Sequence, residues 1–294
     1  MRRNLVIARI GSGSLHEQWL DGDRLREWDL VLCPYQPTPF DDDPRWTTSG
    51  IIPGPKWSGL RTLLNGWDGW RGYERIWLPD DDLLADSRTI DRMFAIAAGA
   101  GLELFAPALD ERSYYAHFST MRNPRFHGRW TGFVEIMMPG FTAGALAELL
   151  PTLDLSTTGW GWGLDSLWPK LLGYRDVGII DATPVLHTRP VGAMRDAELR
   201  ARVLAESDRI LAAGGCRQEH RTLSAFGADL GPLPLSPEAL LAELVHGWRY
   251  LIDRDPRIHA WIADYQRPAT GWIDYPVEGT PAGPAPLDRN CLAG

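Results

Sequence analysis

Short apolar runs that alternate with helix-like segments set the pattern of the first two thirds of the chain. Apolar, β-prone runs of this length are typical of buried strands, and the amphipathic segments between them are typical of helices. We expect strands at residues 4–10, 28–33, 75–78, 102–106, 114–120, 132–138 and 177–180. We expect helices within 15–26 and at 56–64, 87–98, 143–150 and 166–172. This alternation predicts an α/β fold, a single sandwich with a mostly parallel central sheet.

The last third of the chain is expected to be mainly helical. A long amphipathic helix covers 194–213, and another begins at Ser236, where a Ser-Pro pair supplies an N-cap and a first-turn proline. That second helix should run to about residue 253, and 258–265 adds a last turn after the loop 214–231. We therefore expect a sandwich domain over 1–192, a helical extension packed on it over 193–265, and a Pro- and Gly-rich tail over 266–294.

Three consecutive carboxylates, Asp80, Asp81 and Asp82, directly follow the predicted strand 75–78. Such acids repel one another unless a cation or solvent relieves them. Side chains alternate along an extended chain, so Asp80 and Asp82 should point one way and Asp81 the other. Two carboxylates on one side of a strand end suit a hard divalent cation such as Mn²⁺ or Mg²⁺. The alternative is a solvated acidic turn that caps the next helix.

A glycine- and tryptophan-rich loop lies at residues 158–165. Its three glycines permit unusual backbone angles, which would let the loop hold Trp160 and Trp162 in fixed poses, where their faces could stack on a sugar. Core packing is the common alternative for a tryptophan. Asp165 follows the loop and is either the N-cap of the next helix or a general base.

Two further side chains are candidates for ligand contacts. Lys56 begins the predicted helix 56–64, where the helix dipole disfavours a cation, so it could meet an anionic ligand; the alternative is an exposed surface lysine. His187 ends the apolar approach that begins at residue 177 and is either structural or a metal ligand. At the first strand's end, Gly11 opens a Gly/Ser loop that weakly resembles the start of a nucleotide-binding unit.

Composition narrows the class of protein. The chain has 294 residues with 44% hydrophobic and 23% charged, which is ordinary for a globular protein. A net charge of −8 argues against nucleic-acid binding. We find no apolar run long enough for a membrane span, and no signal peptide at the N-terminus. Three scattered cysteines predict neither a disulfide framework nor a zinc site, so a cytoplasmic protein is expected.

The order of these motifs resembles that of a plant and bacterial family of unknown function, labelled as related to lysine–ketoglutarate reductase trans-splicing. Its acidic box, its Val-Glu-Met-Met-Ala-Pro signature and its Trp-Gly-Leu-Asp are matched at Asp80 to Leu83, Val134 to Pro139 and Trp162 to Asp165. The resemblance covers roughly residues 3 to 192.

The same order is similar to that of metal-dependent glycosyltransferases with a Rossmann-like sandwich of the GT-A type. By this resemblance, Asp80 and Asp82 match the box that binds the metal and the donor diphosphate, and His187 completes the metal shell. Asp165 matches the base of inverting members such as the β-1,4-galactosyltransferases. The box is followed here by Leu, and fewer acids follow the Gly-Trp-Gly loop than in those enzymes.

The function implied is transfer of a sugar from a UDP- or GDP-sugar to a glycan or small-molecule hydroxyl, with Mn²⁺ or Mg²⁺. Lys56 and the basic loop 122–129 would face phosphates. The residues expected to bind the donor are Arg9, Gly11, Lys56, Asp80, Asp81, Trp160 and Trp162. Two alternatives stay open: a non-catalytic carbohydrate-binding protein, and a sugar nucleotidyltransferase, for which the loop after residue 10 lacks the expected Gly-rich, Arg- and Lys-containing sequence.

Overall fold

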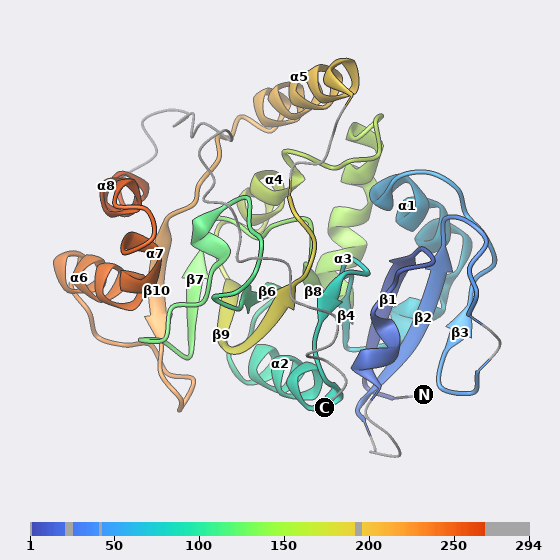
Figure 1. Ribbon diagram of the computed structural model, residues 1–294, viewed down its shortest axis with the longest axis horizontal. Coiled ribbons are helices and arrows are strands. Elements are labelled where there is room, and N and C mark those ends of the chain that lie inside the picture. The colour runs from blue at the N-terminus through green and yellow to red at the C-terminus, as the bar shows by residue number, and fades with distance from the viewer. Residues whose placement is uncertain (1, 21–25, 41–42, 192–195, 268–294) are drawn as a thin grey trace.

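The fold is a single mixed sheet with helices on both faces (Figure 1). The structure, a computed structural model, describes residues 2–20, 26–40, 43–191 and 196–267. The strands are β1 (Asn4–Ile10), β2 (Trp28–Pro34), β3 (Thr47–Thr48), β4 (Arg75–Trp77), β5 (Leu83–Leu84), β6 (Leu104–Leu109), β7 (Gly128–Thr131), β8 (Gly140–Thr142), β9 (Val177–His187) and β10 (Thr222–Phe226). The helices are α1 (Lys56–Gly66), α2 (Ser87–Gly99), α3 (Ala143–Leu149), α4 (Leu164–Leu171), α5 (Ala197–Ala213), α6 (Pro237–Gly247), α7 (Arg249–Ile252) and α8 (Arg257–Tyr265).

The strand order is β10-β7-β9-β6-β8-β4-β1-β2-β3, with β5 paired to β9 off this path. Parallel pairing joins β1 to β2 and β4, β2 to β3, and β6 to β9. Strand β8 runs antiparallel between β4 and β6, and β7 and β10 extend the β9 side in antiparallel fashion. The predicted α/β sandwich, mostly parallel in its core strands, is therefore confirmed.

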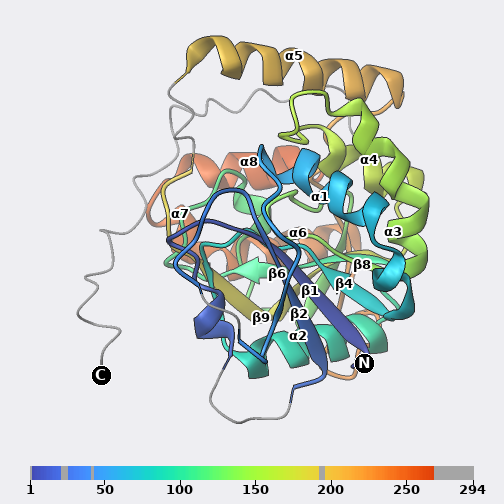
Figure 2. The same cartoon turned by 90° about the vertical axis from the view of Figure 1, so that its right-hand side faces the viewer.

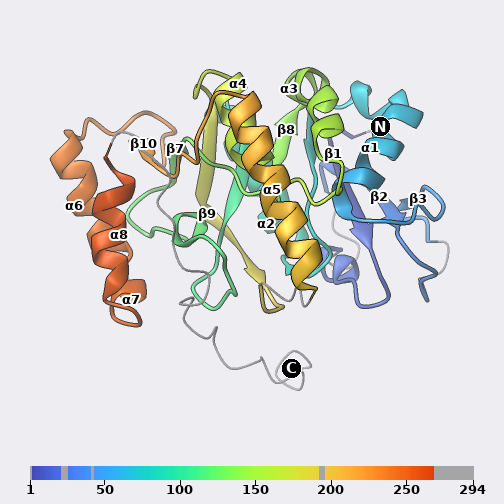
Figure 3. The ribbon, with the colours of Figure 1, turned by 90° about the horizontal axis from the view of Figure 1, so that it is seen from above.

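Helices α1, α3 and α4 cover one face of the sheet and α2 covers the other, while α5 lies outermost above α4 (Figure 2). Seen from above, α5 crosses over the sheet, and α6, α7 and α8 gather beside β10 (Figure 3). All seven residues of β1 are buried, as expected for a parallel strand that is covered on both faces. Buried residues of β1, β2, β4, β6, β8 and β9 and of helices α1 to α4 thus form one core around the middle strands.

The chain reverses its direction of travel through the sheet at β1. It proceeds outward from β1 to β2 and β3, and then returns through α1 to place β4 on the other side of β1. In open α/β sheets, ligands bind at such a switch point, beyond the carboxyl ends of the strands. The segments that follow β1 and β4, which begin with Gly11 and Leu78, meet at this edge.

Two predicted strands are wrong. Residues 114–120 contain only a short 3-10 turn, Phe118–Thr120, and 132–138 form an irregular segment that ends in a turn. Residues Phe133, Val134 and Met138 are nonetheless buried. A short apolar run reports burial rather than backbone conformation, and here it belongs to a loop packed beneath the sheet's edge.

Other boundaries also differ from the prediction. The expected loops 122–129 and 214–231 contain the start of β7 and all of β10, and the helix expected at 236–253 is divided into α6 and α7. Strand β9 continues to His187. Within 15–26 the described residues form only the 3-10 turn His16–Trp19. Nearly all of the predicted tail 266–294 lies outside the described residues. Among the described residues, no helix has the length and apolar character that crossing a bilayer requires.

Candidate functional site

The acidic box is joined by hydrogen bonds to the irregular 132–138 segment and to the residues that directly follow β1 and β9. The amide of Asp80 donates to Met137 O at 2.9 Å, which holds the box against the irregular 132–138 segment. Asp81 Oδ2 accepts a 2.7 Å hydrogen bond from the amide of Gly11 at the end of β1. The carbonyl of Asp82 accepts from the amide and the hydroxyl of Thr188, just after β9. The box therefore lies at the switch point.

The three carboxylates do not alternate as predicted. Asp80 Oδ1 lies 2.7 Å from Lys56 Nζ, whereas Asp81 and Asp82 both contact the guanidinium of Arg189, at 3.3 Å and 3.9 Å. The alternation prediction is wrong because Asp81 and Asp82 form a turn before β5 rather than an extension of β4. Asp80 therefore has a different cationic partner from Asp81 and Asp82.

Asp82 and His187 form a buried pair. His187 Nε2 lies 3.4 Å from Asp82 Oδ2, and its Nδ1 contacts the Tyr114 carbonyl oxygen at 2.8 Å, which orients the ring. Burial alone would lower the pKa of His187, but the hydrogen bond and charge of Asp82 outweigh it and raise that pKa. Burial raises the pKa of Asp82, yet His187 and Arg189 bring it below its ordinary value. Asp82 Oδ1 is buried and has no hydrogen-bond partner among the described residues.

Lys56 is a largely buried cation at the start of α1, not a surface lysine. Its Nζ donates to the carbonyls of Ile136 and Met137 at 2.9 Å and 2.6 Å, in addition to its ion pair with Asp80. Burial lowers the pKa of Lys56, and Asp80 opposes this shift. Burial likewise raises the pKa of Asp80 against the influence of Lys56. The anionic group that Lys56 meets in this structure is therefore Asp80.

Asp165 is buried at the start of α4, behind the glycine-rich loop. Gly159, Gly161 and Gly163 have φ values of 75°, 78° and 95°. Residues with a side chain rarely adopt such values, so the backbone of the loop requires glycine at these three positions. Gly163 is the N-cap of α4, so Asp165 lies in the first turn and is not the cap. Burial raises the pKa of Asp165 to about 7, although Ser166 hydrogen-bonds to it. A carboxyl poised near neutral pH suits a general base.

Glu135 is a residue of this site that the sequence interpretation missed, as is Arg189, which contacts Asp81 and Asp82. It is buried within the irregular 132–138 segment, and its Oε2 has no hydrogen-bond partner among the described residues. Burial raises its pKa to about 7, and the charges of His187, Asp165 and Asp80 act on it as well. The signal in the sequence was an acid inside the apolar run 133–138. Burying a carboxylate without a partner costs free energy, so an acid in a buried run marks a candidate site residue.

These interactions link the predicted site residues into one electrostatic cluster. The charge of Glu135 interacts with His187, Asp165 and Asp80, and His187 in turn contacts Asp82. Asp80, Asp165 and His187 therefore lie near enough to Glu135 for their charges to act on its pKa, and the contact among the predicted metal and base residues is that of His187 with Asp82. Among the described residues, however, no three His, Cys, Asp or Glu side chains are placed so that they could hold a metal ion.

The remaining residues that were predicted to bind the sugar donor differ in how far they are exposed. Trp160 is 38% exposed, whereas Trp162 is half-buried. Arg9 is buried beneath α1, where its guanidinium donates to the carbonyls of Gly54 and Cys33 at 2.7 Å and 3.4 Å. Gly11 offers its amide to Asp81 rather than to open space. Trp160 therefore presents an exposed ring to a ligand, whereas Arg9 and the amide of Gly11 are already engaged within the protein.

Two of the three arginines in the basic loop 122–129 form ion pairs with other segments of the chain. Arg129 is buried and pairs with Asp181, with Nε and Oδ2 2.8 Å apart. Arg125 pairs with Glu243 on α6 at 2.5 Å. Arg129 thus links β7 to β9, and Arg125 links the loop to α6.

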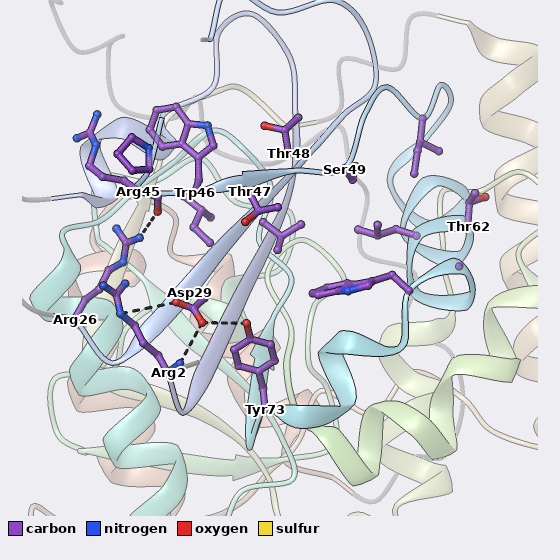
Figure 4. Close-up of a pocket in the computed structure, with 17 residues that line it drawn as sticks. Arg2, Arg26, Asp29, Arg45, Trp46, Thr47, Thr48, Ser49, Thr62 and Tyr73 are labelled. Carbon is purple, nitrogen blue, oxygen red and sulfur yellow. Dashed lines mark hydrogen bonds and ion pairs between the residues drawn. The ribbon is translucent and has the colours of Figure 1, made fainter. Parts of the chain in front are cut away.

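A separate cavity of about 890 Å³ lies between the β2–β3 edge and the second half of α1 (Figure 4). Arg2, Arg26 and Arg45 line one side, and Asp29 there accepts hydrogen bonds from the Arg2 amide and the Tyr73 hydroxyl. None of the predicted site residues lines this cavity. The cavity and the acidic cluster are therefore lined by different residues.

Comparisons with known proteins give likenesses of structure only. No protein-family model and no curated protein matches the chain, so the resemblance to the plant and bacterial family gains no support. The chain is similar to a structure of S. aureus TarS, with 11% identity and a TM-score of 0.43 over 73% of this chain, and it spans 43% of that chain.

Two shorter TarS structures, of residues 1–349, are similar as well. The structure in complex with UDP-GlcNAc has 11% identity and a TM-score of 0.43, and the match covers 73% of this chain and 71% of that one. The other has 10% identity and a TM-score of 0.44, with 90% and 89% covered. With identities and scores this low, the function proposed below rests on the chain's own residues.

Proposed function

We propose that this protein is a metal-dependent glycosyltransferase that moves a sugar from a nucleotide-diphosphate donor to a hydroxyl acceptor. The observation that carries this proposal is the accumulation of buried carboxylates at the switch point. Asp82, Glu135 and Asp165 are buried there, and two of them have pKa values of about 7. Perturbed acids that converge at a ligand-binding edge are the usual mark of a catalytic site.

Asp165 is the proposed base. In its ionised form it would take the proton of the acceptor hydroxyl as that oxygen attacks the anomeric carbon of the donor, and the bond from that carbon to the diphosphate would break. Attack on the face opposite the leaving group inverts the configuration at this carbon. A pKa of about 7 leaves a substantial share of Asp165 ionised at neutral pH, and its basicity there is far above that of an ordinary aspartate.

The residues fit a divalent cation in their chemistry. Asp82 Oδ1 is a buried carboxylate oxygen without a partner among the described residues, and the imidazole Nε2 of His187 lies beside the same carboxylate. Asp82 and His187 would hold Mn²⁺ or Mg²⁺, and Asp80 would join them if it exchanged Lys56 for the ion. When bound, such an ion stabilises the negative charge that develops on a departing diphosphate.

The donor is proposed to be a UDP- or GDP-sugar. Lys56, released from Asp80 by the ion, would then meet the diphosphate. Trp160 would present its exposed ring to a sugar face. The acceptor is a glycan or a small molecule that carries a hydroxyl group.

The direct test is release of nucleoside diphosphate from a panel of UDP- and GDP-sugars, with Mn²⁺ or Mg²⁺ and with chelator. We expect release from at least one donor that depends on the metal and increases with a matching acceptor. Absence of release from every donor, together with absence of nucleotide binding, would contradict the proposal.

A carbohydrate-binding protein without catalysis is the second candidate. The observation that favours it is the ion pair between Lys56 and Asp80, since a cation already lies where a metal would be needed. This candidate predicts sugar binding that persists in chelator and no nucleotide binding.

A further inference from the structure

A buried glutamate of α5 connects the C-terminal third of the chain to the glycine-rich loop. Glu206 is 2% exposed. Its carboxylate accepts hydrogen bonds from the hydroxyl groups of Ser156, Thr157 and Thr158 at 2.9, 2.6 and 2.6 Å, and from the amide of Thr158 at 2.8 Å. Four donors from three consecutive residues thus converge on one side chain of a distant helix.

The hydrogen bonds extend from Glu206 into the loop itself. Ser156 Oγ, which donates to Glu206, also accepts from the amide of Gly161 at 2.9 Å. A methyl group placed on Gly163 would lie 3.1 Å from the carbonyl oxygen of Ser207, the residue after Glu206. The same α5 turn therefore contacts residues 156–158 and Gly163 directly, and it reaches Gly161 through Ser156.

The other side of the loop rests on α1. A methyl group on Gly161 would lie 2.4 Å from the ring of Trp57, and one on Gly159 would lie 2.8 Å from the hydroxyl of Ser58. The loop is consequently fixed between the start of α1 and the middle of α5. Its exposed ring, Trp160, and the buried Asp165 that follows both depend on this placement.

The four hydrogen-bond donors around Glu206 favour the ionised form of its carboxylate. Burial raises its pKa, but the hydrogen bonds from Thr157, Thr158 and Ser156 outweigh burial and bring the pKa below its ordinary value. An ionised carboxylate has acceptor sites for all four donors, whereas a glutamine would turn its amide hydrogens toward at least one of them. The interaction therefore depends on the carboxylate and not only on the shape of the side chain.

We propose that Glu206 is a positioning residue, which fixes the loop 156–163 and through it the sugar-contacting face of Trp160, so that α5 is part of the substrate site. The positioning follows from the hydrogen bonds, whereas the role in sugar binding rests on the function proposed above. No residue of α5 was a candidate in the sequence, because Glu206 lies about fifty residues from its partners.

The positioning is tested first by amide hydrogen exchange of the whole protein. Glu206→Gln should speed exchange in residues 156–163 by about tenfold or more, since local opening no longer breaks charge-assisted hydrogen bonds. Glu206→Asp, which keeps the charge, should restore part of the protection. The control is Asp208→Asn, an exposed residue on the same helix, which should leave the loop unchanged. Unchanged loop exchange in Glu206→Gln would overturn the inference.

The role in the substrate site is tested by steady-state kinetics with UDP-GlcNAc as the probe. Glu206→Gln should raise KM about tenfold and change kcat less than about threefold, because the loop positions a sugar but does not transfer the proton. A fall in kcat alone, or equal kinetics in both proteins, would overturn this part. If the wild-type protein bound no nucleotide sugar, the proposed function would fail, and loop exchange would still decide the positioning.

Discussion

Two regions of this protein bury charged groups, and they do so in opposite ways. Between β7 and β9, Arg129 and Asp181 are almost fully buried and face each other through two hydrogen bonds of 2.8 Å and 3.1 Å. Nη1 of Arg129 donates to the carbonyl of Ser119, and Nη2 donates to that of Met121 as well as to Asp181. Asp181 also accepts from the amide of Asn123. Every polar atom of this pair has a partner.

At the switch point the balance is different. Asp82, Glu135 and Asp165 are buried, and two of their carboxyl oxygens, Asp82 Oδ1 and Glu135 Oε2, have no hydrogen-bond partner among the described residues. A satisfied buried pair fixes a structure, whereas unsatisfied buried acids cost stability unless a ligand or a reaction requires them. The comparison therefore assigns structure to the first region and chemistry to the second.

The largest expected effect is on turnover. Asp165→Asn should lower kcat by about 10²–10⁴-fold, because the base that accepts the hydroxyl proton is lost. Donor binding should be retained. The matched control is Glu148→Gln, which neutralises an exposed acid on α3. Full activity in Asp165→Asn would move the proton transfer elsewhere, with Glu135 as the next residue to change.

A change in the pair of Arg129 and Asp181 should affect stability. Arg129→Met should lower the free energy of unfolding by about 3–5 kcal/mol, since Asp181 would remain as a buried, unpaired charge. Urea unfolding measures this loss. The double variant with Asp181→Leu should recover most of it. A loss below about 1 kcal/mol in the single variant would show that the pair is not the fixed element described here.

The effect of the buried Asp165 on the free energy of unfolding should depend on pH. The pKa of Asp165 is raised from 3.8 to about 7, so the folded protein takes up a proton as pH falls through 7, while the unfolded chain does so only near 4. The contribution of Asp165 to stability therefore improves as pH falls from 8 toward 4. Asp165→Asn should be more stable than the wild type at pH 8, by up to about 4 kcal/mol, and this advantage should shrink below pH 7.

A half-buried histidine, His117, supplies the control of opposite sign. Burial lowers the pKa of His117 from 6.5 to about 4, so its neutral form favours the folded state. Its contribution is complete above pH 6.5 and is lost as pH falls toward 4. Melting temperatures of Asp165→Asn and His117→Gln between pH 4 and 8 separate the two contributions. A constant difference between Asp165→Asn and wild type would contradict the raised pKa.

The smallest expected effect is at the exposed ring. Trp160→Ala should leave the unfolding free energy within about 0.5 kcal/mol and raise KM for the sugar donor or acceptor about two- to tenfold. Leu171→Ala, another large exposed apolar side chain, is the control and should change neither. An unchanged KM would remove Trp160 from the sugar site.

The site residues that lie at the ends of strands could be predicted from the sequence. Asp80 to Asp82 follow a buried run and His187 ends another, and these segments meet because their strands belong to one sheet. It did not predict Glu135, because burial of a loop and burial of a strand give the same apolar run. Glu206 was out of reach as well, since a hydrogen bond between distant segments leaves no local pattern.

The central claim is that the acids at the switch point bind a nucleotide diphosphate together with a divalent cation. The most direct measurement is the melting temperature with UDP or GDP, with and without Mn²⁺, in the wild type and in Asp82→Asn. We predict a metal-dependent rise in the wild type, equivalent to about 2.7 kcal/mol at a hundredfold excess over Kd, and its loss in Asp82→Asn. No rise with either nucleotide, or a rise that survives Asp82→Asn, would contradict the claim.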